Sequence, residues 1–565
     1  MKAPTEILSC DVLVIGGGGA GCRAAIEAAR CGNSVILVNK FPIGRSGTTI
    51  TAMITYTGTM GQLGICPDDG PDVLFWDVVR GGHRLGNQDL IEVFCRGARD
   101  TVLELDSWGM KWDRVDGKFT ATRLPGQTYP RGNHRDAITG MMMQRVLCEQ
   151  VRKHENIRVI DNLMVTKILE DAGRAAGAVA LDIASGRFLT FHAGSVVLAT
   201  GGAGRLYKVT SMPEDARGDG FALAYRAGAT MMDMEFQQFY PTCVVFPTSV
   251  RGVMVPGAIV YPQGARLINS LGEPFMHKYD PIRKEMATRD MMSRGMALEI
   301  AAGRGGTHGG VFIDCSKVPD LVAKHPKSFG LFKSIGMESF DRIEVAPGAH
   351  FSIGGIQINP FCESNVPGLY ACGEVATGMH GANRCGGNAL AETQVFGRIA
   401  GEQAAAFARY NAKTDFCEED VDKEIARVRS FLTGESKETP KELICELQEL
   451  MYKNAGLIRS EESLLNTLNQ LVDLKARASD VKAGGGEKYN LAWIDAIDLQ
   501  NMIQIAELIC VSALQRKESR GAHFRLDYSE PDDTFLKHFC ITLDKQDGRT
   551  ITSTPVIRTR EEVES

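Results

Sequence analysis

An arginine set among glycines is the part of the sequence best suited to bind an acid. Arg384 lies in the run His380-Gly381-Ala382-Asn383-Arg384-Cys385-Gly386-Gly387-Asn388-Ala389-Leu390, which leads into an apolar helical pattern. A guanidinium can bind a carboxylate through two parallel hydrogen bonds, and glycines let the backbone approach a flat or phosphorylated ligand closely. The run therefore predicts a site for an organic acid beside a cofactor, with Arg384, Ala389 and Leu390 near that cofactor.

The N-terminal segment has the pattern of a dinucleotide-binding βαβ unit. An apolar run at 11–15 predicts a strand, G-x-G-x-x-G follows at 16–21, and 22–32 and 34–38 predict a helix and a second strand. The glycines permit a tight turn and admit a pyrophosphate, which the helix N-terminus stabilises. The acidic residue expected about 20 positions on is replaced by Asn39-Lys40. The predicted cofactor contacts are Gly16, Gly18, Gly19, Ala20, Gly21, Asn39 and Lys40.

Two later segments repeat the pattern of a buried strand that runs into polar residues and glycines. One covers 195–202 and ends in Ala199, Thr200 and Gly201, and the other covers 367–374 and ends in Glu374. A large cofactor would contact all three strand ends. We therefore add these four residues to the predicted cofactor site.

The order of these segments resembles the flavoprotein subunit of succinate dehydrogenase and fumarate reductase, a family that also includes L-aspartate oxidase. The resemblance covers almost the whole chain and includes runs at 217–220, 233–236, 289–294, 350–355, 395–398 and 518–523. It implies that the cofactor is FAD, with Asp219 in the first of these runs among its contacts. It also implies an oxidoreductase that interconverts an unsaturated and a saturated carboxylic acid, with hydride transfer at flavin N5.

The resemblance assigns catalytic roles to three residues. An arginine at the position of Arg289 is the proton donor in the family, and Arg384 and His350 match residues that hold one substrate carboxylate. Taken alone, Arg289 would be read as an exposed helix charge and His350 as a core histidine. The motifs around them favour the catalytic interpretation.

The sequence departs from the family at the other end of the substrate. Members that act on succinate or fumarate have a histidine at the position of Tyr240 in the run Gln238-Phe239-Tyr240-Pro241-Thr242. They also have Thr-Glu-Gly followed by Arg-Gly-Glu-Gly in the cap. In this chain the corresponding residues, 255–264, are Val-Pro-Gly-Ala-Ile-Val-Tyr-Pro-Gln-Gly. We expect an acid whose far group is not a small carboxylate, with Tyr240 in the site. Tyr240 and Tyr261 could offer a hydroxyl or an aromatic wall. The alternative is the same substrate with rearranged ligands.

A third departure concerns the attachment of the flavin. Family members with covalent FAD have histidine between serine and threonine in an Arg-Ser-His-Thr run, and this chain has Arg45-Ser46-Gly47-Thr48. Glycine cannot form that bond, so we expect noncovalent FAD, with Arg45, Ser46 and Thr48 still among its contacts.

The source of electrons is predicted to be a separate iron–sulfur subunit. The sequence has neither a second G-x-G-x-x-G in a βαβ context nor a ferredoxin or haem cysteine pattern. Fumarate reductase or succinate dehydrogenase proper, direct use of oxygen as in an aspartate-oxidase-like enzyme, and a noncatalytic electron-transfer flavin subunit remain alternatives.

Length and composition fit a multidomain globular enzyme. The 565 residues carry a net charge of -6, with 44% hydrophobic and 23% charged residues, so nucleic acid is not an expected partner. Its 15 cysteines include no C-x-x-C, and we expect no metal site. We find no apolar run of the roughly 18 residues that a membrane span needs, and expect a cytoplasmic protein that meets a membrane only through partner subunits.

The predicted fold class is α/β. We expect a Rossmann-like FAD-binding domain at 1–232 and 352–415, with an α+β capping domain inserted at 233–351 that carries substrate contacts. A helical domain at 416–514 and a small C-terminal segment at 515–565 follow. Within the helical part, Leu464, Leu465, Leu468, Leu471 and Val472 share one helical face and predict packing between helices.

Overall fold

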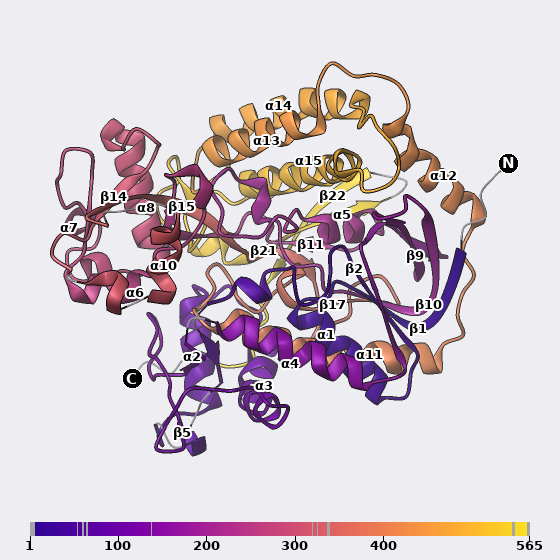
Figure 1. Cartoon of the computed structure of the whole chain (residues 1–565), viewed down its shortest axis with the longest axis horizontal. Helices are drawn as coiled ribbons and strands as arrows, with labels where there is room; N and C mark the ends of the chain where they lie inside the picture. The colour runs from indigo at the N-terminus through magenta and orange to yellow at the C-terminus, as the bar shows by residue number, and fades with distance from the viewer. Residues whose placement is uncertain are drawn as a thin grey trace.

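The computed structural model describes residues 6–53, 55–58, 61–63, 66–136, 138–318, 320–324, 326–335, 340–544 and 548–561 (Figure 1). It is a mixed α/β structure with a helical C-terminal region, as the sequence predicted. The layers are organised around a seven-stranded sheet in the order β7-β2-β1-β10-β9-β8, with β17 also paired to β10. Its strands are β1 (Glu6–Ile15), β2 (Val35–Asn39), β7 (Ile157–Asp161), β8 (Leu163–Asp171), β9 (Arg174–Asp182), β10 (Phe188–Leu198) and β17 (Leu369–Ala371).

The parallel part of this sheet places the three predicted strand ends side by side. β1 pairs in parallel with both β2 and β10, and β10 pairs in parallel with β17. Parallel strands end at the same edge of a sheet, and ligands bind there in open α/β sheets. Helices α1 (Gly19–Arg30), α4 (Thr139–Lys153) and α11 (Asn388–Tyr410) lie along this part of the molecule (Figure 1). The loop of Arg384 therefore leads into α11 beside the glycine turn that leads into α1.

A second sheet, with its own apolar core, forms a separate lobe at the left of Figure 1. Its strand order is β12-β15-β14-β13. β12 and β15 are antiparallel neighbours, with Phe239 opposite Ala349 and Tyr240 opposite Gly348. The elements of this lobe are β12 (Gln237–Val244), α6 (Gly257–Val260), β13 (Arg266–Ile268), α7 (Met276–Tyr279), α8 (Arg289–Glu299), β14 (Val311–Asp314), α9 (Leu321–Lys324), α10 (Pro326–Ser334) and β15 (Arg342–Ser352).

The C-terminal hairpin completes a third sheet rather than forming an isolated tail. Its strand order is β18-β16-β11-β21-β22. One strand that precedes the second lobe in sequence and two that follow it therefore share a sheet with the hairpin near the C-terminus. These strands are β11 (Met231–Met232), β16 (Gly355–Gln357), β18 (Ala376–Thr377), β21 (Lys537–Asp544) and β22 (Gly548–Pro555). Other helices and short strands outside these three sheets are α2 (Pro71–Gly81), α3 (Gln88–Ser107), α5 (Asp219–Arg226), β3 (Tyr56–Thr57), β4 (Arg114–Val115), β5 (Lys118–Phe119), β6 (Gly132–Asn133), β19 (Ile458–Arg459) and β20 (Phe524–Arg525).

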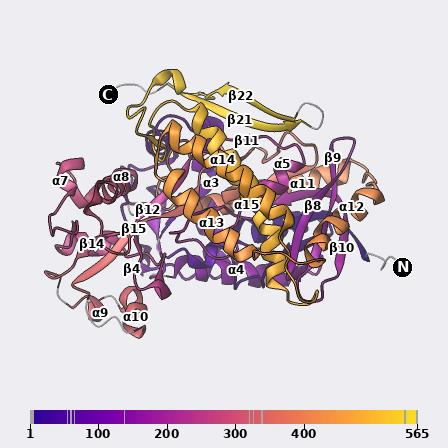
Figure 2. The ribbon, with the colours of Figure 1, turned by 90° about the horizontal axis from the view of Figure 1, so that it is seen from above.

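The helical region packs α13, α14 and α15 together (Figure 2). Leu464 and Leu471 of α14 are buried, but Leu465 is 47% exposed and Val472 is 71% exposed, so the predicted five-residue stripe was too wide. Both exposed residues follow a buried one directly, and one residue turns a helix by about 100°, away from the packed face. The helices are α12 (Glu418–Arg429), α13 (Pro440–Asn454), α14 (Glu461–Asp480) and α15 (Leu491–Gln515).

Helix α15 is long and apolar enough to cross a membrane by length and composition alone. In the structure, however, 78% of its most apolar stretch is buried, and it packs against α13, α14 and α5. Its apolar surface is thus accounted for by contacts inside the protein.

Candidate functional site

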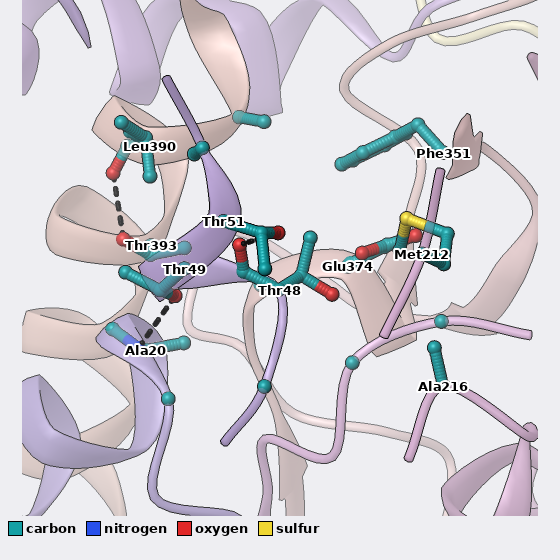
Figure 3. Close-up of a pocket in the computed structure, with 18 of the residues that line it drawn as sticks. Ala20, Thr48, Thr49, Thr51, Met212, Ala216, Phe351, Glu374, Leu390 and Thr393 are labelled. Atoms are coloured by element: carbon teal, nitrogen blue, oxygen red, sulfur yellow. Dashed lines mark hydrogen bonds between the residues drawn. The ribbon is translucent and has the colours of Figure 1, made fainter. Parts of the chain in front are cut away.

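A cavity lies where the ends of β1, β10 and β17 face the start of α11 and the strands β12 and β15. Figure 3 shows the wall formed by Ala20, Thr48, Thr49, Glu374 and Leu390. The four predicted catalytic residues also line it. The predicted site residues that line the cavity are Gly16, Gly18, Gly19, Ala20, Asn39, Thr48, Ala199, Thr200, Gly201, Tyr240, Arg289, His350, Glu374, Arg384, Ala389 and Leu390.

The glycine turn is shaped to bring backbone to the cavity. Gly16 has φ +108°, and a Cβ there would lie 2.3 Å from the carbonyl oxygen of Ala199. A Cβ on Gly21 would lie 1.7 Å from the carbonyl oxygen of Gly16, so Gly21 serves the close packing of turn and helix and does not line the cavity. The turn thus leaves an open cradle at the N-terminus of α1, where a pyrophosphate is stabilised.

Asn39 lines the cavity, but Lys40 does not. Asn39 Oδ1 accepts a hydrogen bond from the backbone N–H of Gly17 (2.8 Å), and its Nδ2 donates to Ser46 Oγ (3.1 Å). Lys40 Nζ instead lies 2.7 Å from Asp498 Oδ1 of α15 and 3.6 Å from Asp219 Oδ2. Lys40 and Asp219 therefore form an ion-pair network with the helical region.

Arg45 and Ser46 also lie outside the cavity lining. Arg45 is exposed, while Ser46 contacts Asn39 and donates to the carbonyl oxygen of Pro42 (3.1 Å). Direct cofactor contacts by these two residues, and by Gly21, Lys40 and Asp219, stay predictions.

Arg384 is buried in the wall of the cavity and hydrogen-bonded to Gln238. Its Nη2 donates to Gln238 Oε1 (2.9 Å), and Gln238 Nε2 donates back to the carbonyl oxygen of Arg384 (2.9 Å). The guanidinium lies 4.6 Å above the ring of Phe351, and Arg384 Nε is buried without a hydrogen-bond partner among the described residues. Burial, reinforced by the charge of Arg289, lowers the pKa of Arg384 to about 9.

Arg289 is the first residue of α8, and its guanidinium lies over the ring of Tyr240. Its guanidinium lies 5.2 Å from the ring centre of Tyr240, and Nη1 is buried without a partner in the described part of the chain. Burial lowers its pKa. Two arginines that line one cavity, each with a buried nitrogen that has no hydrogen-bond partner among the described residues, create a strong preference for an anion. A bound carboxylate satisfies such donors and offsets the like charges.

His350 completes the cluster from β15. Its Nδ1 lies 2.8 Å from Ser211 Oγ, and its ring centre lies 5.3 Å from that of Tyr240. Burial and, secondarily, the charges of Arg384 and Arg289 hold the pKa of His350 well below its usual range. The imidazole is therefore neutral at physiological pH and can offer one donor and one acceptor.

The side of the cavity formed by the second lobe is mostly uncharged. Tyr240, Met254 and Pro256 line it. Tyr261, also expected near the substrate, is buried in the lobe core and does not line the cavity, and its hydroxyl has no partner among the described residues. Of the two tyrosines, only Tyr240 therefore lines the cavity, and its role toward a substrate stays a prediction.

Several lining residues were not predicted from the sequence. Thr49 Oγ1 accepts the backbone N–H of Gly19 (3.0 Å), and Thr393 Oγ1 donates to the carbonyl oxygen of Leu390 (2.6 Å) (Figure 3). The run of threonines after Gly47 was a usable signal, since hydroxyls next to a glycine-rich loop suit a phosphate or ribose. Nothing local to the sequence marked Ser211, Met212, Asp215 or Ala216, which also line the cavity.

Two family models match the chain. The model described as FAD binding domain covers residues 11–390, and the model described as Fumarate reductase flavoprotein C-term covers residues 445–564. The chain belongs to the fumarate reductase and succinate dehydrogenase flavoprotein family. It is thus an FAD-dependent oxidoreductase.

Full-length relatives of this flavoprotein are known. It is 39% identical to one subunit of the fumarate reductase (CoM/CoB) of Methanothermobacter marburgensis, over 93% of this chain and 96% of the relative, and 33% identical to the fumarate reductase flavoprotein subunit of a Serratia strain, over 94% and 92%. Among solved structures, Mycobacterium smegmatis Sdh1 has a TM-score of 0.91 at 35% identity, over 98% of this chain and 95% of that chain. The FrdA chain of E. coli quinol fumarate reductase also has a TM-score of 0.91, at 29% identity over 99% of both chains.

The residues present fit FAD. The glycine cradle, the buried hydroxyl of Thr200 that has no partner among the described residues, and the strand ends of β1, β10 and β17 offer a continuous backbone-lined surface for a dinucleotide. Glu374 accepts the backbone N–H of Ser352 (2.9 Å), and burial raises the pKa of its carboxyl to about 8, so it is protonated near neutral pH and can donate to a ligand. Among the described residues, no group of three or more His, Cys, Asp or Glu side chains could hold a metal ion.

Acid precipitation of the holoenzyme should release all of its flavin. Gly47 lines the cavity at the position of the family's covalent histidine, has φ +83° and offers no side chain for a bond. After precipitation and centrifugation, absorbance at the flavin maximum should be found in the supernatant, and the intact mass of the protein should equal that of the chain alone. Yellow colour that stays in the washed pellet, or a mass increased by one FAD, would show that another residue forms the bond.

Proposed function

We propose that this flavoprotein reduces the carbon–carbon double bond of a short α,β-unsaturated carboxylic acid, as a fumarate reductase-like catalytic subunit. The observation that carries the proposal is the convergence of Arg289, His350 and Arg384 on the FAD-binding cavity. Two of these are arginines that each have a buried nitrogen without a partner among the described residues, and the third is a neutral imidazole. That set suits one carboxylate and one proton transfer.

Each residue has a distinct role in this proposal. Arg384, held in place by Gln238, binds the near carboxylate with His350. FAD, when bound, supplies the hydride to one carbon of the double bond. Arg289 supplies the proton to the neighbouring carbon, because burial lowers its pKa and makes the guanidinium a better acid than one in water. The cation–π contact with Tyr240 holds the guanidinium in position.

The far group of the acid is proposed to meet Tyr240, Met254 and Pro256. Apart from Arg289, which is assigned to proton transfer, no described residue on this side of the lining is cationic. We therefore propose an acid with a neutral far group. Fumarate, named for several relatives, is the alternative substrate, since the phenol of Tyr240 could donate to a second carboxylate.

Turnover with reduced viologen as electron donor tests both statements. We expect oxidation of the dye by unsaturated acids, with a kcat/KM for monomethyl fumarate or crotonate at least about tenfold above that for fumarate, because a far carboxylate lacks its clamp. A higher kcat/KM for fumarate would refute the neutral far group and leave the reaction type intact. No turnover with any of these acids, together with reoxidation by oxygen alone or by another redox protein alone, would refute the reaction type.

The physiological electron source is proposed to be a separate iron–sulfur subunit. Several relatives are named as subunits, which supports an assembly of more than one chain. Purification from the native source tests this: an iron-containing partner should elute with the flavoprotein. A cytoplasmic location, with membrane contact only through partners, is part of the same proposal and is tested by cell fractionation.

The domain boundaries are also proposed rather than shown. We propose a capping domain at 233–351, because the separate core and all of the second sheet except the last residue of β15 fall within that range.

A further inference from the structure

Ser211 lies against the imidazole of His350 in a position fixed by backbone contacts. Its Oγ is 2.8 Å from His350 Nδ1, and both residues line the cavity. The backbone N–H of Ser211 donates to the carbonyl oxygen of Ala349 (3.0 Å), next to His350 in β15. On the other side, a Cβ on Gly252 would lie 2.0 Å from the carbonyl oxygen of Thr210, so the segment is tightly packed from both directions.

The surrounding hydrogen bonds decide the direction of the Ser211–His350 contact. Among the described residues, the other acceptor within reach of the Ser211 hydroxyl is the carbonyl oxygen of Ala349, at 3.4 Å. That oxygen already accepts Thr210 Oγ1–H (2.9 Å) and Ser211 N–H (3.0 Å), which are closer and use its two lone pairs. This arrangement favours a Ser211 hydroxyl that donates to Nδ1 of His350 over one that donates to Ala349.

A neutral imidazole that accepts at Nδ1 must carry its proton on Nε2. The groups that face His350 keep it neutral: burial and the cations of Arg384 and Arg289 oppose a positive ring, and the Tyr240 ring adds no charge. With the opposite tautomer, the free Nε2 would present a lone pair to a carboxylate and repel it.

We propose that Ser211 is a positioning residue, which donates to Nδ1 of His350 and so presents Nε2–H as a neutral donor to the substrate carboxylate beside Arg384. The proposal rests on the proposed function, since it assigns how one end of the acid is bound. It makes carboxylate binding depend on a hydroxyl that does not itself need to touch the acid. Serine and threonine can fill this role, whereas alanine cannot.

The direct test is the tautomer of His350 in the FAD-loaded protein. Histidine labelled with ¹⁵N should show His350, assigned by its loss in His350→Gln, with the proton on Nε2 in the wild type. In Ser211→Ala, the signal should shift toward the Nδ1–H form, and Ser211→Thr should restore the wild-type pattern. A proton on Nδ1 in the wild type would overturn the proposal whether or not any acid is turned over.

Kinetics give a second readout that a merely structural role would not produce. With crotonate and with fumarate in the reduced-viologen assay, Ser211→Ala should raise KM about tenfold and change kcat less than about threefold, from the loss of one hydrogen bond to a charged group. Ser211→Thr should restore KM, and the exposed helix-end change Ser479→Ala should have no effect. Unchanged KM in Ser211→Ala at full FAD content would overturn the proposal, whereas absence of turnover in the wild type would instead refute the proposed function.

Discussion

Replacing Arg289 with glutamine should lower kcat about a thousandfold while FAD stays bound, within the range that a positioned general acid contributes. Glutamine keeps a polar side chain on α8 but cannot give a proton to carbon. The structure leaves Arg289 Nη1 buried and without a partner among the described residues, with the guanidinium fixed over Tyr240. Rapid-mixing and steady-state assays with reduced viologen measure the effect, and flavin absorbance confirms that the variant is loaded.

A matched control comes from the same helix. Arg294 of α8 is also partly buried, but its guanidinium lies 4.3 Å from the ring of Phe524 and does not line the cavity. Arg294→Gln should keep kcat within about threefold of wild type, because no proton transfer depends on it. If Arg289→Gln lost no more activity than Arg294→Gln, the proton would have to come from another group.

Replacing Arg384 with alanine should lower kcat/KM by about a hundredfold to a thousandfold, mainly through KM, because truncation of one partner of a buried charge pair costs 2–5 kcal/mol. The substrate carboxylate would then face Gln238 and a neutral His350 in place of a cation. Steady-state kinetics with each acid measure the loss, with FAD content determined in parallel.

Two further measurements separate lost charge from lost folding. Guanidinium ion added to Arg384→Ala should recover part of the activity, since it can occupy the vacated space. Arg384→Lys should keep a kcat/KM below that of the wild type although it retains the positive charge, because lysine lacks the bidentate geometry. A KM for Arg384→Ala within threefold of wild type would remove this residue from carboxylate binding.

The parts of the fold that could be predicted are those governed by local sequence. The glycine turn between β1 and α1 was predictable because it needs residues without a Cβ. The structure shows this need at Gly16 and Gly21, where a Cβ would collide with a backbone carbonyl oxygen. The family motifs also brought together Arg289, His350 and Arg384, although they are up to 95 positions apart. Here the resemblance carried information that periodicity could not.

The parts that could not be predicted depend on contacts between distant segments. Lys40 Nζ lies 2.7 Å from Asp498 Oδ1 of α15, and no local pattern at Lys40 indicates an ion pair across 458 positions, while its contact with the cofactor stays a prediction. The contact of Ser211 with His350 depends on the pairing of its segment with β15, which no local pattern indicates. The exposed Leu465 and Val472 show the limit of helical periodicity, which fixes the direction of a side chain but not the width of the packed face.

Anaerobic reoxidation of the photoreduced holoenzyme tests the central claim most directly, because the reoxidation step itself needs neither an electron donor nor a partner subunit. The account predicts that one equivalent of crotonate or fumarate restores the oxidised flavin spectrum and yields one equivalent of the saturated acid, and that Arg289→Gln, reduced in the same way, does so about a thousandfold more slowly. Reduced flavin that persists in the presence of every unsaturated acid, but is oxidised at once by air, would contradict it.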